Sequence, residues 1–174
     1  YNILSALAVI SIYKNIFKLN ENIFLNFKIP GGRGDHSVIK IDNKKINLID
    51  QSYNSNPLSL KSAIKNFDKI KSKKSKKYLL LGDMLELGSH SKKLHQSIAP
   101  IINQTKIDKV FVKGKMASII FEGISKAKKG RILLNKSQII ELIRKDLNNN
   151  DYLMIKASLA TGFNDIVKDL KGLH

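Results

Sequence analysis

The fold is decided by two stretches, residues 49–57 (IDQSYNSNP) and residues 81–88 (LGDMLELG). Each follows an apolar run that is typical of a buried strand, and each precedes a pattern of helical period. Open α/β sheets bind their ligands at the carboxyl ends of the strands. The polar side chains of both stretches are therefore predicted to lie together at a ligand-binding edge.

Outward from these stretches, strand and helix patterns alternate along the chain, which predicts an α/β fold with a mainly parallel sheet. Ser89, Ser137 and Ser158 are candidate helix N-caps. The expected strands are 37–41, 45–50, 78–82, 108–113, 131–134 and 151–156, and the first two form a hairpin. The expected helices are 1–18, one that starts at Pro57, 89–104, 116–128, 137–147 and 160–170.

Polar residues after the predicted strands are the candidate ligand groups. Asp50 is placed to orient a ribose or a phosphate-bound group, and Tyr53, Asn54 and Asn56 offer neutral hydrogen-bonding groups. An Asx-rich loop that caps a helix is the alternative, and it accounts well for Asn56. Asp83 directly follows the strand expected over 78–82. There it either contacts a ligand or serves as a helix-end group.

Two further segments carry candidate groups. Residues 31–34 (GGRG) combine glycines, which allow close approach to phosphate, with the planar donor fork of Arg33. The alternative is a flexible turn with a solvated arginine. Residues 151–158 (DYLMIKAS) form a strand that ends near Lys156 and Ser158. A lysine in this place is often only an end residue whose charge reaches water.

Composition narrows the function classes. The formal net charge is +17, yet only Arg33, Arg131 and Arg144 among the 31 basic residues are arginines. Because nucleic-acid readout favours arginine, we expect a solvated lysine surface and no nucleic-acid partner. Cysteine is absent, which fits a reducing compartment. Neither a signal peptide nor an apolar run long enough to cross a membrane is recognisable, so we expect a cytoplasmic protein without membrane insertion.

Four segments in order, residues 1–8 (YNILSALA), 31–34, 49–57 with 81–88, and 151–158, resemble the Mur ligases. The resemblance implies a Rossmann-like C-terminal Mur ligase domain over 30–174, preceded by the helical tail of a truncated central ATP-binding domain over 1–29. It implies that Asn2, Arg33 and Asp50 contact the nucleotide, and that Lys156 and Ser158 face the substrate cleft. The chain departs from the family pattern at Gln51, where an acidic residue is common, and at Ala157, where glycine is usual.

The resemblance also implies a reaction. It is closest to the member that uses ATP and Mg²⁺ to join D-alanyl-D-alanine to UDP-N-acetylmuramoyl-tripeptide through an acyl phosphate. The resemblance then implies that Tyr53, Asn54, Asn56 and Asp83 contact the substrate, together with Lys156 and Ser158. The sequence contains no phosphate loop of the type GxxxxGK[ST]. We therefore expect the chain alone to be inactive, the full-length enzyme to be monomeric, and no catalytic or metal-ligating residue in this part.

Two alternatives remain at this stage. Another Mur ligase or a relative of folylpolyglutamate synthase would keep the reaction class and change the amine. A non-catalytic, basic Rossmann-like module that binds RNA would change the class altogether, and it predicts binding that weakens steeply with salt.

Overall fold

The computed structural model describes residues 2–18, 20, 22, 31–72 and 74–172. Its centre is a sheet of six strands in the order β1-β2-β6-β3-β4-β5. β1 and β2 pair antiparallel, and the other neighbouring strands pair parallel. The strands are β1 (Asp35–Ile41), β2 (Lys44–Gln51), β3 (Lys77–Gly82), β4 (Lys109–Lys113), β5 (Lys129–Ile132) and β6 (Tyr152–Lys156). The predicted hairpin and mainly parallel sheet are confirmed.

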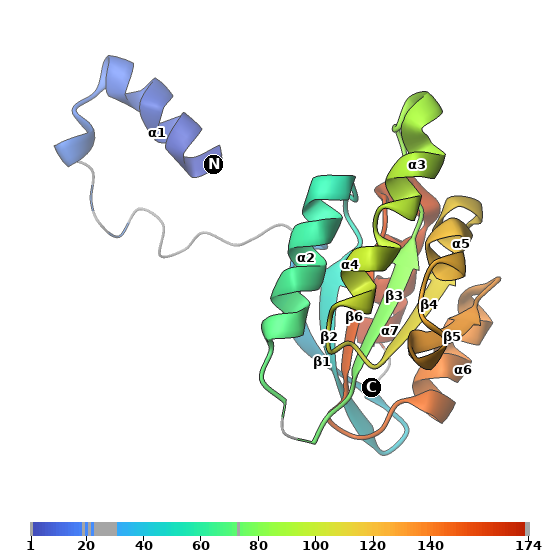
Figure 1. Ribbon diagram of the computed structural model, residues 1–174. Helices are drawn as coiled ribbons and strands as arrows, with labels where there is room; N and C mark the ends of the chain where they lie inside the picture. Colours follow the sequence, from blue (N-terminus) through green and yellow to red (C-terminus); the bar gives the residue numbers. More distant parts are fainter. Residues whose placement is uncertain (1, 19, 21, 23–30, 73, 173–174) are drawn as a thin grey trace.

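Helices cover both faces of this sheet (Figure 1). The α-helices are α1 (Asn2–Tyr13), α2 (Pro57–Lys69), α3 (Ser91–Gln96), α4 (Ala99–Asn103), α5 (Lys115–Glu122), α6 (Lys136–Asp146) and α7 (Phe163–Gly172). Short 3-10 turns are η1 (Ile16–Lys18), η3 (Gly88–His90), η4 (Lys126–Lys128) and η5 (Leu159–Thr161). α2, α4 and α5 pack on one face, and α6 and α7 pack on the other. Buried on both sides, β3 reads as a continuous apolar run.

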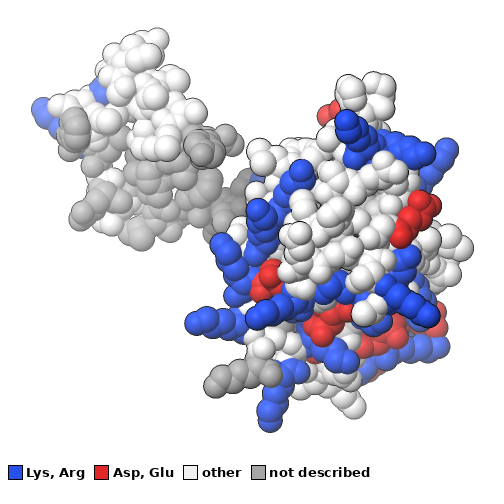
Figure 2. All heavy atoms as spheres, viewed as in Figure 1, with Lys and Arg blue, Asp and Glu red and all other residues white. Residues whose placement is uncertain are grey.

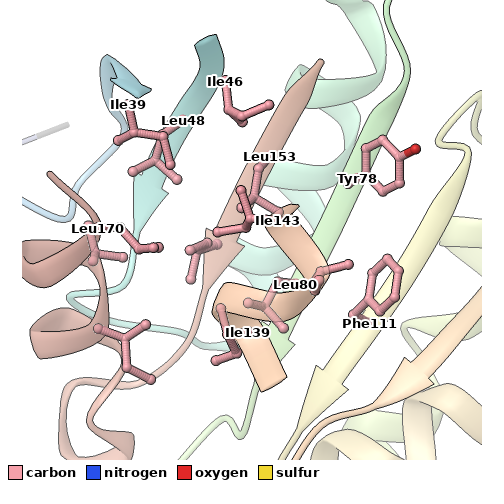
Figure 3. Packing of buried hydrophobic residues seen from close by; sticks show 14 of the residues in the cluster. Ile39, Ile46, Leu48, Tyr78, Leu80, Phe111, Ile139, Ile143, Leu153 and Leu170 are labelled. Atoms are coloured by element: carbon pink, nitrogen blue, oxygen red, sulfur yellow. The ribbon is translucent and has the colours of Figure 1, made fainter. Parts of the chain in front are cut away.

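The core beneath α6 and α7 is mostly aliphatic and contains three aromatic rings, those of Tyr78, Phe111 and Phe163. Leu48, Leu80 and Leu153 from three adjacent strands meet Ile139 and Ile143 of α6 (Figure 3). At one side of this layer the rings of Tyr78 and Phe111 stack, with centroids 6.3 Å apart. These side chains alternate along each strand with those that face the opposite helix layer, as the pleat requires. Both layers together fix the register of the strands and hence the position of their carboxyl ends.

Helix boundaries differ from prediction where local chemistry intervenes. The single helix expected over 89–104 is divided into η3, α3 and α4, because Pro100 lacks an N–H and fits only the first turn of a new helix. The helix expected over 116–128 ends at Glu122, and Gly123 follows it as the C-cap.

Two of the three predicted serine caps are wrong, and the third, Ser158, holds the N-cap position of η5 without a side-chain cap bond. α6 begins after Asn135, whose side chain accepts the Gln138 N–H at 3.0 Å, so Ser137 lies inside the helix. Ser89 lies within η3, and the side chain of Ser158 makes no cap bond to η5. Side-chain oxygens that could cap are common in this sequence, and tertiary contacts decide which of them do so.

α1 lies apart from the sheet in Figure 1. Its apolar residues Leu4, Val9, Ile12 and Tyr13 are exposed. The assignment of residues 1–29 to a different domain stays a prediction, and residues 23–30 lie outside the described part of the chain.

Charged side chains are dispersed over one face of the molecule. Figure 2 shows lysine and arginine side chains spread over the visible face of the sheet domain, with acidic side chains among them. Within the described residues, no helix has the length and apolarity that a membrane crossing needs.

Candidate functional site

A pocket of about 350 Å³ lies at the carboxyl ends of β2, β3 and β6. The structure therefore brings three of the predicted site residues, Tyr53, Asn54 and Ser158, to one pocket. It adds four lining residues that the sequence did not single out, namely Leu85, Glu86, Leu159 and Ala160. A larger pocket of about 730 Å³ at the opposite end of the sheet is lined by no predicted site residue.

Ser158 joins the three loops that surround the pocket. Its hydroxyl accepts the Leu85 N–H at 3.0 Å and lies 3.2 Å from the carbonyl of Ser55, to which it donates. Its own N–H donates to the carbonyl of Asp83 at 3.1 Å. One side chain thus ties the loop after β6 to the loops after β2 and β3.

Lys156 supports the pocket wall from inside the protein. It is 2% exposed, and its Nζ donates to the carbonyl of Asn54 at 2.8 Å. No carboxylate of the described residues forms an ion pair with it. Burial lowers the pKa of Lys156 to about 8, because the charged ammonium loses its hydration. The observed contact fixes the neighbouring loop, and the predicted contact of Lys156 with substrate stays a prediction.

Asp50 is buried, 2% exposed, and belongs to an ion cluster. One carboxylate oxygen accepts the N–H and the hydroxyl of Ser52 at 3.0 and 2.6 Å. The other lies 3.1 Å from Nζ of Lys171 on α7, which also pairs with Asp35 at 2.5 Å. The pKa of Lys171 is raised: burial lowers it, but the hydrogen bonds to Asp35 and Asp50 outweigh burial. The protein's own groups thus engage both oxygens of Asp50, and the predicted nucleotide contact stays a prediction.

The same cluster holds the glycine-rich segment that carries Arg33. Asp35 accepts the Gly32 N–H at 2.7 Å, and the backbone carbonyl of Asp50 accepts the Gly34 N–H at 2.7 Å. The guanidinium of Arg33 lies 4.5 Å from the ring centroid of Tyr53, a cation–π distance. Arg33 is therefore held beside the pocket. The side chain of Asn2, the other predicted nucleotide contact, lies outside the described part of the chain.

Asp83 binds the start of the next helix. Its Oδ1 accepts the N–H of Ala117 at 2.7 Å, in the first turn of α5. Gly114 precedes this helix with φ of +134°, and a Cβ there would lie 2.2 Å from the Asp83 carboxylate. The observed contact is the helix-end role weighed in the sequence analysis, and the predicted contact of Asp83 with substrate stays a prediction.

Ala157 is accommodated by Gly82 on the adjacent strand. Ala157 is fully buried, and its methyl lies 2.6 Å from the point where a Cβ of residue 82 would stand. The ring of Phe163 closes the same space at 2.5 Å. The methyl group of Ala157, which stands where the family usually has glycine, therefore fills space that Gly82 leaves open.

Asn56 caps α2. Its side chain accepts the Ser59 N–H at 2.8 Å, and the Ser59 hydroxyl accepts the Asn56 N–H at 3.1 Å, which completes a capping box. This contact is the alternative that the sequence analysis kept open for Asn56. Its predicted contact with substrate stays a prediction.

Replacement of Asn56 with alanine is expected to lower the free energy of unfolding by about 1 kcal/mol, because the cap bond is lost. Urea denaturation followed by circular dichroism measures the change. Asn54→Ala is the matched control, since no side-chain bond of Asn54 is present in the structure. Equal stability of the two variants would show that the cap contributes nothing.

No group of three or more His, Cys, Asp or Glu side chains able to hold a metal occurs among the described residues. His95 is fully buried, where its Nε2 accepts the Met84 N–H at 3.0 Å and its Nδ1 lies 2.8 Å from the Ser91 carbonyl. It therefore holds the loop after β3 in place.

Residues 37–159, which include the whole pocket except Ala160, match the family model described as Mur ligase, glutamate ligase domain. The chain belongs to the Mur ligase family. Its matched part contains the strands whose ends surround the pocket.

Two curated relatives of this Mur ligase chain share a name. The UDP-N-acetylmuramoyl-tripeptide--D-alanyl-D-alanine ligase of Bacillus subtilis (strain 168) is 34% identical over 146 residues, 82% of this chain and 31% of that protein. The ligase of the same name from Buchnera aphidicola subsp. Acyrthosiphon pisum is 34% identical over 125 residues, 71% of this chain and 26% of that protein. The matched part of the chain thus spans between a quarter and a third of the length of these relatives.

Solved structures agree on the fold. MurF ligase from Thermotoga maritima in complex with ADP matches 98% of this chain and 37% of its own, with a TM-score of 0.71 at 23% identity. MurF from Acinetobacter baumannii matches 94% of this chain and 35% of its own, with a TM-score of 0.72 at 20% identity.

Proposed function

We propose that this chain is the C-terminal part of an ATP-dependent ligase that joins D-alanyl-D-alanine to UDP-N-acetylmuramoyl-tripeptide through an acyl phosphate. The observation that carries the proposal is the pocket at the ends of β2, β3 and β6, lined by Tyr53, Asn54 and Ser158. These residues come from segments that resemble the family in sequence, and two curated relatives with that printed name support the choice of amine.

The part played by this chain is to position the incoming dipeptide. The loops around the pocket are tied together by Ser158 and Lys156, so the lining is held rigid before substrate arrives. Attack on an acyl phosphate needs the amine nitrogen close to the carbonyl carbon in a fixed orientation. A pre-formed pocket supplies much of that advantage by removing the entropy of alignment.

The nucleotide is proposed to lie mainly against residues outside this chain. Within it, Arg33 is the group suited to phosphate, because its guanidinium is held beside the pocket and carries a full charge. A relative whose structure holds ADP supports nucleotide use. The described acidic and histidine side chains do not fit Mg²⁺, so the metal would be held elsewhere. We also infer a cytoplasmic monomer, inactive when reduced to these 174 residues.

Expression of the complete open reading frame that contains this segment tests the proposal. Phosphate release from ATP is measured with UDP-N-acetylmuramoyl-tripeptide and a panel of amines: D-alanyl-D-alanine, D-alanine, L-lysine and L-glutamate. Release is expected with the dipeptide and is expected to be at least a hundred times slower with the single amino acids. Preference for a single amino acid would assign the chain to another Mur ligase or to a folylpolyglutamate synthase relative.

A further inference from the structure

The carboxylate of Glu86 has no hydrogen-bond or ion-pair partner in the described part of the chain, whereas nearly all the other carboxylates there do. Among the described residues, the side chains of every Asp and of Glu141 accept a hydrogen bond or form an ion pair. Only Glu86 and Glu122 have no such partner in that part of the chain. Glu122 ends α5, whereas Glu86 lines the pocket.

The backbone presents Glu86 in an unusual conformation. Its φ is +62°, in the left-handed region, which a residue with a Cβ adopts at a cost of about 1–2 kcal/mol. The two preceding N–H groups are fixed, Leu85 by Ser158 at 3.0 Å and Met84 by the buried His95 at 3.0 Å. Such strain persists only where the surroundings enforce it, and it concentrates at functional sites. Two anchored neighbours therefore hold Glu86 at the pocket despite the cost.

The lining of the pocket defines the chemistry of its occupant. Leu85 and Leu159 are 38% and 45% exposed, large values for leucine, and both line it together with Ala160. Glu86 is the single charged residue of that lining, which contains no Lys or Arg although the protein carries a formal charge of +17. A negative group beside small aliphatic surface suits a cation with short aliphatic side chains.

We propose that Glu86 binds the ammonium group of the incoming amine substrate, while Leu85 and Leu159 contact its aliphatic side chains. The inference rests on the proposed function, because an amino acid or short peptide is the substrate that brings such a cation. An α-amino group with a pKa near 7.7–8.0 is mostly protonated at pH 7. The carboxylate also discriminates against acidic amines, since like charges repel.

Titration of the 174-residue chain by NMR tests the role of Glu86. D-alanyl-D-alanine is compared with N-acetyl-D-alanyl-D-alanine, which lacks the ammonium group. We expect saturable shifts of the backbone amides of Tyr53, Leu85 and Leu159 with the free dipeptide, and at least tenfold weaker binding of the acetylated one. Glu86→Gln is expected to weaken binding of the free dipeptide tenfold, to the affinity of the acetylated peptide.

Two further variants make the outcome specific. Glu86→Gly removes the carboxylate and suits a positive φ, so it is expected to bind as weakly as Glu86→Gln without harm to the fold. Glu122→Gln removes the other free carboxylate and is expected to bind like the unmodified chain. Equal binding of both peptides, no saturable binding of either, or unchanged affinity in both Glu86 variants would overturn the inference.

Failure of the proposed function is distinguishable from failure of this inference. If the complete enzyme prefers another amine, the same titration is made with that amine. Sensitivity to Glu86→Gln then upholds the role of the carboxylate while the choice of dipeptide falls. Insensitivity with the preferred amine overturns the role of Glu86 while the ligase assignment stands.

Discussion

Replacement of Lys156 with methionine is expected to stabilise this chain and to lower ligation by the complete enzyme about 100-fold. Methionine has nearly the length of lysine and removes a buried charge that has a carbonyl but no carboxylate as partner. Removal of such a charge stabilises a fold by more than the lost hydrogen bond contributes, here by about 1 kcal/mol net at pH 7. Urea denaturation at pH 7 measures the gain.

The gain is expected to depend on pH in a definite direction. The pKa of Lys156 is about 8 in the folded chain, against about 10.4 for an unperturbed lysine. Between these values the unfolded chain binds more protons, so the stability of the unmodified chain rises with pH relative to the variant. The advantage of Lys156→Met should be full below about pH 8 and absent above about pH 10.5. A pH-independent difference would contradict the assignment of the charge as the destabilising group.

Activity is expected to move in the opposite direction. Without the bond from Lys156, the carbonyl of Asn54 is free and the lining formed by Tyr53 and Asn54 loses its fixed position. Misplacement of about 1 Å can cost on the order of 100-fold in rate. Lys77→Met is the matched control: Lys77 is also buried and donates to the carbonyl of Asp68, but it lies at the opposite end of the sheet. Normal ligation by Lys156→Met would remove Lys156 from the site.

Most of the fold was predictable because its signals are local. Alternating apolar runs and helical periods mark the strands, and both faces of β3 are apolar as a doubly covered strand requires. What failed depended on competition between local and tertiary contacts. Ser158 was expected to cap a helix, but its hydroxyl bonds Leu85 and Ser55, which lie 73 and 103 residues away along the chain. No sequence window contains such information.

The convergence of the candidate residues was predictable from the sequence, whereas their roles as ligand contacts stay predictions. Residues after β2, β3 and β6 do converge, because parallel strands end at one edge of the sheet. Several of them, however, bind the protein itself: Asn56 caps a helix, Asp83 binds the start of another, and Asp50 lies in an ion cluster. Polar residues at strand ends thus bind other parts of the protein near the pocket, and the sequence alone does not distinguish this structural role from contact with a ligand.

Two residues with a place in the site or its supporting cluster were not named as candidates, for opposite reasons. Lys171 lies on the last helix, 121 residues from Asp50, so its pairing is invisible before the chain is folded. Glu86 lies within the quoted segment LELG, between two leucines, but the property that distinguishes it is its positive φ, which the sequence does not reveal. A glutamate between leucines ordinarily suggests a helix, whereas here it marks a strained turn.

Replacement of Lys171 with methionine is expected to lower the free energy of unfolding by about 2–3 kcal/mol. Asp50 would remain buried without its cation, a change that costs about 3–5 kcal/mol for fully buried pairs and less here because the Lys171 side chain is 32% exposed. Lys168→Met, one turn earlier on α7, is the control. Its pair with Asp165 is 67% and 78% exposed, so a change within about 0.5 kcal/mol is expected. Urea denaturation at pH 7 compares the two.

The contribution of Lys171 is confined to a pH window. The pKa of Asp35 is lowered, since burial raises it but the hydrogen bonds of Lys171 and of the Gly32 N–H prevail. The stability that the pair of Asp35 with Lys171 contributes is therefore present above about pH 4, and it is lost as the pH falls through the lowered pKa of Asp35. Because the pKa of Lys171 is raised, the stability that its ion pairs contribute persists until the pH rises beyond about 10.5.

The same variant tests whether the ion cluster positions Arg33. Asp35 and Asp50 hold Gly32 and Gly34, and through them the arginine that lies on Tyr53. If the cluster only stabilises the fold, Lys171→Met enzyme assayed well below its melting temperature should keep the KM for ATP. If it also fixes Arg33, that KM should rise several-fold at pH 7 and remain unchanged in Lys168→Met. A stability loss without any change in KM would confine Lys171 to the fold and leave Arg33 to be positioned by Tyr53 alone.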